Sequence, residues 1–258
     1  MDKVESEEGV TVSYEKHGSG PPLILVHGGF SDHRSNWEFV LPLLEMQFTV
    51  YAVARRGRGE TDATEGHSVE DEGRDIAALI HAVGEPVFLL GHSYGAHAAL
   101  VAAAMMPDKI HKLVLYEPPS PHILSKDVLG SLTARAQAGD WEGFTVSFFS
   151  DVLFVPIEEL NALRASELWA PIIADAKASL GDLRAISRYE FKPERFTELR
   201  MPILLQIGTR SPRDLYVTDG LSAAHRDVRV QQLEGQAHEG MTTAPGLYAE
   251  AVSRFLLA

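Results

Sequence analysis

Cysteine is absent from the 258 residues of this chain. A disulfide scaffold, a cysteine-ligated zinc or iron–sulfur site and a cysteine nucleophile are therefore excluded. Long apolar runs are missing too, because the most apolar stretch, Ala98 to Met106, is about half of the ~20 residues that cross a bilayer. The segment from Met1 to Gly9 lacks the basic region and apolar run of a secretory signal. We therefore expect a cytoplasmic protein with no membrane partner.

Positive charge is scarce as well. The chain has 23 Lys and Arg residues against 36 Asp and Glu, which gives a net charge of −13 and a pI near 5.3. A surface of this kind repels the phosphate backbone of nucleic acids, so we expect no nucleic-acid partner. The sequence contains no H-E-x-x-H, no paired histidines and no acidic metal loop, and no G-x-G-x-x-G follows an expected strand. We expect neither a metal nor a cofactor.

What the chain does contain is a series of short apolar runs separated by helical patterns. Hydrophobic residues make up 45% of the chain and charged residues 23%, the balance of a globular protein with a sizeable core. Short runs of this kind indicate parallel strands that are buried on both faces. The expected strands are Val10–Glu15, Leu23–Val26, Phe48–Ala54, Pro86–Leu90, Leu113–Tyr116, Ile203–Ile207 and Val228–Leu233.

Helical patterns lie between these runs. Ser68 to Asp71 forms a capping-box-like start, after which Ile76, Leu79, Ile80 and Val83 recur at helical spacing. Alternating strand and helix units predict a three-layer α/β fold with an eight-stranded, mostly parallel sheet.

One long segment breaks this alternation. From about residue 121 to 195 no strand is expected, only helical pattern rich in aromatic side chains. Because expected strands flank it on both sides, we interpret residues 121–195 as a helical cap inserted into a core of residues 1–120 and 196–258.

The strongest chemical signal is Gly91-His92-Ser93-Tyr94-Gly95. It follows an expected strand and precedes an expected helix, which is the setting that a nucleophile elbow requires. A sharp turn there lifts the Ser93 hydroxyl clear of the backbone and places it beside the positive end of a helix. We predict Ser93 as the nucleophile.

A nucleophilic serine needs a base. His238 lies in the loop after the last expected strand, at the carboxyl edge of the sheet where Ser93 also lies. This position distinguishes it from the other histidines, and we predict it as the general base.

With these residues in view, the chain resembles an α/β-hydrolase with a cap. The resemblance rests on Leu25-Val26-His27-Gly28-Gly29, on the elbow at Ser93 and on the His238 loop, and it covers essentially the whole length. It implies an oxyanion hole formed by the N–H groups of Gly29 and Tyr94, with Phe30 as the alternative to Gly29. A backbone N–H about 3 Å from the developing oxyanion is the physical requirement. We interpret His27 as structural.

The acid of the triad departs from the usual family pattern. Most members carry it three residues after the glycine that ends the penultimate strand, and here that position is Ser211. Two carboxylates remain as candidates. Glu117 ends the Leu113–Tyr116 strand and is followed by two prolines that fix its position, and Asp214 lies three residues beyond Ser211. We favour Glu117, which is similar to the placement in zearalenone-type lactone hydrolases, and keep Asp214 as the alternative.

A serine nucleophile forms an acyl-enzyme, so we expect a hydrolase acting on an ester, lactone, thioester or amide, most simply a carboxylic ester or lactone. Large side chains, including Trp37 and the cap aromatics, predict a small, mostly apolar acyl substrate. Its expected contacts are Phe30, Trp141, Phe148 and Trp169. The alternatives are a ligand receptor of the same fold, and a cofactor-free lyase or perhydrolase using the same serine and histidine. We expect a monomer or a homodimer.

Overall fold

An eight-stranded sheet organises the protein in the computed structural model, which describes residues 1–258. Its strand order is β1-β2-β4-β3-β5-β6-β7-β8. The pairs β1–β2 and β2–β4 are antiparallel, and all other neighbouring pairs are parallel. The strands are β1 (Asp2–Glu5), β2 (Thr11–His17), β3 (Pro22–Val26), β4 (Thr49–Val53), β5 (Val87–His92), β6 (Ile110–Tyr116), β7 (Ile203–Gly208) and β8 (Val228–Leu233). The predicted eight-stranded, mostly parallel sheet is confirmed.

Strand β1 is the one that the apolar pattern missed. Its four residues, Asp-Lys-Val-Glu, are mostly charged and mostly exposed. It forms because an antiparallel register with β2 satisfies its backbone groups at the edge of the sheet, with Asp2 opposite Tyr14.

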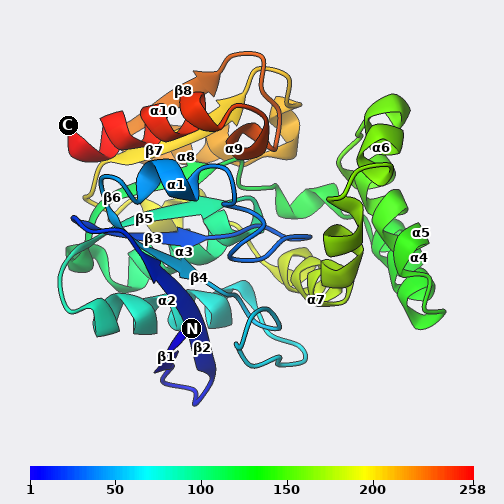
Figure 1. The fold of residues 1–258 in the computed structure, drawn as a ribbon, viewed down its shortest axis with the longest axis horizontal. Helices are drawn as coiled ribbons and strands as arrows, with labels where there is room; N and C mark the ends of the chain where they lie inside the picture. Colours follow the sequence, from blue (N-terminus) through cyan, green and yellow to red (C-terminus); the bar gives the residue numbers. More distant parts are fainter.

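Helices cover both faces of the sheet (Figure 1). Along β3, Leu23 and Leu25 enter one apolar core, while Ile24 and Val26 enter the core on the opposite face. This alternation follows from the two-residue period of a strand. The first core packs under α1 (Leu41–Leu44), α9 (Gly240–Thr243) and α10 (Pro245–Leu257), and the second packs against α2 (Val69–Val83), α3 (Tyr94–Met105) and α8 (Thr218–Ala224).

Between β6 and β7 the chain leaves the sheet and forms a separate group of helices, on the right in Figure 1. These helices are α4 (Lys126–Gln137), α5 (Trp141–Ser147), the π-helix Phe148–Val152, α6 (Ile157–Arg164) and α7 (Trp169–Arg188). Their apolar side chains form a third cluster that also includes Phe30 and Tyr94 from the core. This region, which we call the cap, therefore packs directly on loops at the carboxyl edge of the sheet.

Strand register brings the sequence-predicted site residues to one edge. His92 at the end of β5 is paired with Tyr116 at the end of β6, so Ser93 and Glu117 leave the sheet side by side. Short 3-10 helices complete the fold at Pro107–Lys109, Pro121–Ile123, Pro193–Phe196 and Arg213–Leu215. None of the helices is both long and apolar enough to cross a membrane.

Candidate active site

Ser93 occupies a strained turn between β5 and α3. Its φ is 53°, a left-handed value that non-glycine residues rarely adopt. The turn is held because the Ser93 N–H donates to the Tyr116 carbonyl at 2.9 Å. A glycine is required at position 95, since a Cβ there would lie 2.3 Å from the His27 carbonyl oxygen. The close approach of the first helical turn to the His27 loop thus leaves the half-buried serine hydroxyl at the edge of the sheet.

A continuous chain of hydrogen bonds runs from this hydroxyl to a buried carboxylate. Nε2 of His238 lies 2.9 Å from Oγ of Ser93. On the other side of the ring, Nδ1 lies 2.7 Å from Oε2 of Glu117. The Glu117 side chain is fully buried, and that of His238 is 18% exposed. Proton transfer from the hydroxyl to a histidine that a carboxylate orients is the chemistry that this arrangement permits.

Glu117 is held as firmly as the serine. Its φ is 49°, again in the left-handed region, and its N–H donates to the Gln206 carbonyl of β7 at 3.1 Å. Burial raises the pKa of the Glu117 carboxyl, but the hydrogen bond and charge of His238, the Ser211 hydroxyl and the Gly208 N–H outweigh it and lower that pKa. The Gly208 bond is 2.7 Å long. Glu117 is therefore ionised at neutral pH, as an orienting group must be.

His238 titrates under the influence of this carboxylate. Burial lowers the pKa of the imidazole, but the hydrogen bond and negative charge of Glu117 raise it by more, so the net shift is upward. The imidazole is thereby a stronger base than a free histidine, which suits it to accept a proton from Ser93.

Tyr216 is a part of the site that sequence reasoning missed. Its ring stacks on His238 with centroids 5.6 Å apart and an interplanar angle of 17°, and its hydroxyl lies 3.2 Å from Nδ1 of His238. Burial, and next the charge of Glu117, raise the pKa of the Tyr216 hydroxyl, which stays protonated. The only signal in the sequence is an aromatic residue a few positions after the end of β7, which is too common to be informative.

The two backbone N–H groups predicted for the oxyanion hole are unpaired. The N–H groups of Gly29 and Tyr94 have no acceptor within the protein, whereas the Phe30 N–H donates to Oγ of Ser179 at 2.7 Å. A Cβ on Gly28 would lie 3.1 Å from Cβ of Ser93, so only glycine lets this loop approach the nucleophile so closely. Phe30, the alternative donor, is thus engaged by the cap, and Gly29 and Tyr94 are the available pair.

His27 is fully buried in the same loop. Its Nδ1 lies 2.7 Å from the Gly28 carbonyl, and its Nε2 accepts from the Arg55 N–H at 3.2 Å. Burial, and next the charges of Arg55 and Arg58, hold the pKa of His27 well below its usual range. A neutral ring with both nitrogens occupied fits the structural interpretation of this residue.

Asp214, the alternative acid, makes no hydrogen bond with His238. It is exposed in the 3-10 helix Arg213–Leu215. Ser211, at the position where most of the resembled family carry the acid, is instead close enough to lower the pKa of Glu117 through its hydroxyl.

Aromatic side chains of the cap meet the loop that carries Gly29. Phe30 stacks on Phe148 with ring centroids 4.6 Å apart, and Trp169 packs edge-on against Phe149 at 6.5 Å. Trp141 contacts Phe144 in the same way at 5.7 Å. Trp37 does not join them, because it is fully buried in the core under α1, α9 and α10 and so contributes no surface for a substrate.

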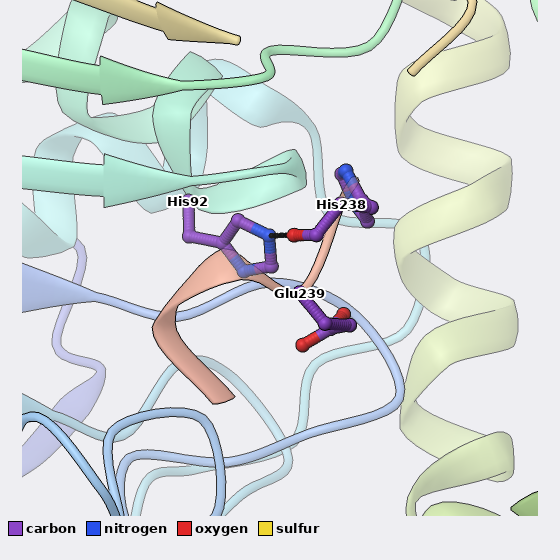
Figure 2. Close-up of side chains that lie close together, drawn as sticks. All are labelled: His92, His238 and Glu239. Carbon is purple, nitrogen blue, oxygen red and sulfur yellow. Dashed lines mark hydrogen bonds between the residues drawn. The ribbon is translucent and has the colours of Figure 1, made fainter. Parts of the chain in front are cut away.

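Two groups of side chains have the spacing of metal ligands, namely His92, His238 and Glu239, and His67, Glu72 and Asp182. Figure 2 shows the His92 ring facing the backbone carbonyl of His238, with Nε2 3.0 Å from that oxygen. Both ring nitrogens of His238 are already paired with Ser93 and Glu117. In the second group the two carboxylates are paired with Arg55. In the first group only the Glu239 carboxylate is left without a hydrogen-bond partner.

Comparison with known proteins identifies relatives of this chain in sequence and in fold. The model of the Alpha/beta hydrolase family matches residues 23–251. A curated relative, 2-(acetamidomethylene)succinate hydrolase of Mesorhizobium japonicum, is 26% identical over 269 residues, covering 96% of this chain and 92% of that protein. The crystal structure of an alpha/beta hydrolase from Sphaerobacter thermophilus has a TM-score of 0.85 at 29% identity, covering 98% of this chain and 99% of that one. The enol-lactonase from Burkholderia xenovorans shares the fold, with a TM-score of 0.80 at 17% identity over 100% of both chains.

Proposed function

The chain belongs to the alpha/beta hydrolase family, and on that premise we propose that it hydrolyses a carboxylic ester or lactone through an acyl-enzyme formed on Ser93. The observation that carries this proposal is the hydrogen-bonded chain from Ser93 through His238 to Glu117. The unpaired N–H groups of Gly29 and Tyr94 support it. Acyl transfer needs a nucleophilic serine, a general base, an acid that orients the base, and two hydrogen-bond donors to the oxyanion.

In the first half-reaction, Oγ of Ser93 attacks the acyl carbon and its proton passes to Nε2 of His238. The carbonyl electron pair moves onto oxygen, where the Gly29 and Tyr94 N–H groups stabilise it. Glu117 stabilises the imidazolium that forms. The tetrahedral intermediate then collapses, and the leaving oxygen takes the proton from His238.

In the second half-reaction, water replaces the leaving group. His238 removes a proton from the water, whose oxygen attacks the acyl carbon of the Ser93 ester. Collapse of the second tetrahedral intermediate releases the carboxylic acid and returns the proton to Oγ of Ser93. For a lactone the leaving oxygen stays attached, so the product is a single hydroxy acid.

The substrate class is inferred from the surroundings of the site. Glu117 lies after β6, as in the zearalenone-type lactone hydrolases that the sequence resembles, and this favours a lactone among the esters. Phe30 and Phe148 place apolar surface beside the Gly29 loop, with Trp141 and Trp169 further along the aromatic cluster. A small, mostly apolar acyl group fits such surroundings.

An amide is the second candidate bond. The relative that matches 96% of this chain is named for the hydrolysis of an acetamidomethylene compound. The same serine chemistry cleaves an amide when His238 protonates the departing nitrogen.

The test is to quench a reaction with p-nitrophenyl butyrate in acid and measure the intact mass. We expect a butyryl adduct on Ser93 and steady release of butyrate, neither of which Ser93→Ala gives. A panel of aryl esters, macrolactones and acetanilides then ranks the bond types. A stable adduct without turnover would favour the ligand receptor, and absence of both the adduct and butyrate release would favour the lyase and overturn the proposal.

A further inference from the structure

Arg55 lies at the junction of the two segments that carry the free N–H groups. Its side chain is fully buried, and its guanidinium donates to the carbonyl oxygens of His27 and Gly28, at 2.8 Å each. The same guanidinium lies 4.5 Å from the centre of the Tyr94 ring. It therefore contacts both the oxyanion loop and the first residue of α3.

The bond to the Gly28 carbonyl controls the direction of the Gly29 N–H. The two groups belong to one planar peptide unit, and the chain has no cis peptide bond, so they point in opposite directions. With the oxygen held by Arg55 and by Nδ1 of His27, the N–H is fixed on the other side. A charged donor on the carbonyl also polarises the peptide, which strengthens its N–H as a donor.

Arg55 is itself held in one orientation by two carboxylates. Glu72 of α2 accepts from its Nη1 at 2.9 Å, and Asp182 of α7 accepts from its Nη2 at 2.7 Å. Both carboxylates are buried, with 2% of each side chain exposed. A planar guanidinium that is bound on several edges cannot rotate without breaking a hydrogen bond. A lysine ammonium could rotate, because its three N–H groups are not fixed in one plane.

Helix α7 adds a second link from the cap to the same loop. Asp182 also accepts from Nη2 of Arg58 at 2.8 Å, and Oγ of Ser179 accepts from the Phe30 N–H at 2.7 Å. One face of α7 therefore forms the outer support of the Gly28–Phe30 loop. Helix α7 thus helps to hold the Gly28–Phe30 loop in position.

We propose that Arg55 is a positioning residue for the oxyanion hole: anchored by Glu72 and by Asp182 of the cap, it orients and polarises the Gly28–Gly29 peptide that stabilises the tetrahedral intermediate. This inference rests on the proposed function, because it concerns the transition state of acyl transfer at Ser93. Arg55 does not touch the reacting atoms and acts only through the peptide.

The test compares Arg55→Lys with Arg56→Lys. Arg56 is the matched control because it is also buried and pairs with carboxylates, through two bonds of 2.6 and 3.0 Å to Asp75 and at 3.5 Å from Glu8, yet it contacts no carbonyl of the oxyanion loop. Each variant is assayed for kcat and KM on p-nitrophenyl butyrate and for inhibition by phenylboronic acid, whose tetrahedral adduct on serine carries an oxygen in the oxyanion hole. Thermal unfolding measures the stability of each.

For Arg55→Lys we expect kcat to fall roughly 10- to 100-fold with KM nearly unchanged, since a displaced donor costs somewhat less than the 10²–10³ of a deleted one. Affinity for the boronic acid should fall in parallel. Arg56→Lys should lower the melting temperature but keep kcat and boronate affinity. Asp182→Asn, which retains Arg55 but removes one anchor, should lower kcat by a smaller factor of about 3 to 10.

Equal kcat and boronate affinity in Arg55→Lys and Arg56→Lys would overturn the positioning role while leaving the proposed function intact. If Arg55→Lys does not fold, an unchanged kcat in Asp182→Asn would overturn that role equally. A wild-type protein that neither turns over the ester nor forms an acyl adduct at Ser93 would instead overturn the proposed function, and the positioning role with it.

Discussion

Two histidines of this protein, His238 and His67, lie within 3.1 Å of a carboxylate oxygen, and they differ in what else their ring nitrogens contact. His238 has one carboxylate, Glu117, on Nδ1 and the Ser93 hydroxyl on Nε2. His67 lies between two carboxylates, with Nε2 3.1 Å from Glu72 and 3.8 Å from Asp182. Burial lowers the pKa of His67, but hydrogen bonds to Asp182 and Glu72 and their charges raise it to about 10.

The two histidines have different roles because their surroundings differ. A general base must lose its proton near neutral pH, and a ring with a pKa of about 10 does not. His67 is therefore a fixed cation in a closed cluster with Arg55 and Arg58. His238 faces a hydroxyl that can give up a proton and keeps 18% of its side chain exposed, so it can cycle between two protonation states.

Of the variants considered, we expect the largest effect when the carboxylate that pairs with His238 is replaced. In Glu117→Gln we expect kcat to fall roughly 10³- to 10⁴-fold, because the imidazolium loses its counter-charge. Since Glu117 raises the pKa of His238, its loss should also move the acidic limb of the kcat/KM profile to lower pH.

The matched control is Asp75→Asn. Asp75 is a buried carboxylate that pairs with Arg56 at 2.6 Å, away from the triad. It should lower stability and leave the pH profile in place, and a similar loss of kcat in both variants would contradict the role of Glu117.

Moving the acid should recover part of the lost activity. Ser211 lies close to the Glu117 carboxyl and lowers its pKa, so an aspartate there can reach the same side of His238. In a Glu117→Gln background, Ser211→Asp should restore kcat by about 10-fold or more, as one charge–imidazole interaction is worth about 1.5–3 kcal/mol. Thr209→Asp adds the same charge at an exposed position and should restore nothing. Equal rates for the two double variants would show that an aspartate at position 211 does not replace Glu117.

Loss of the Tyr216 hydroxyl should be a milder change. Tyr216→Phe keeps the stacked ring but removes the group 3.2 Å from Nδ1 of His238. We expect kcat to fall about 2- to 5-fold with KM unchanged, which corresponds to one ordinary hydrogen bond. A rate equal to wild type would assign Tyr216 to packing alone.

On the structural side, His67→Gln should change stability and its pH dependence. The folded pKa of about 10 lies above the ordinary 6.5, so the stabilisation from His67 is complete below pH 6.5 and is lost as pH rises toward 10. The melting-temperature difference from wild type should therefore shrink across that range. The exposed His122→Gln is the control and should show no such trend. A difference that stays constant to pH 10 would contradict a buried imidazolium.

Much of the fold could be predicted because its signals are local. Apolar runs, the capping box at Ser68 and the strand–turn–helix around Ser93 each lie within a few residues, and the structure shows a capping box between Ser68 and Asp71. Strand β1 was missed because its pairing with β2, not its composition, makes it a strand.

The buried ion cluster could not be predicted, because it depends on contacts across the chain. Arg55 meets Asp182, 127 residues away, only once α7 has packed on the oxyanion loop. Acidic residues are common at a helix N-terminus and need no partner there, yet Glu72 and Asp75 near the start of α2 are buried against Arg55 and Arg56. One signal is present in the sequence: these two carboxylates share the apolar face of α2, where an unpaired charge is costly.

The central claim is that Ser93 is an activated nucleophile, and intact mass after treatment with a fluorophosphonate tests it most directly. We expect one rapid addition to the wild-type protein, mapped by peptide digestion to Ser93, none on Ser93→Ala, and much slower addition on Glu117→Gln. An unlabelled wild-type protein, or a label on any residue other than Ser93, would contradict the account.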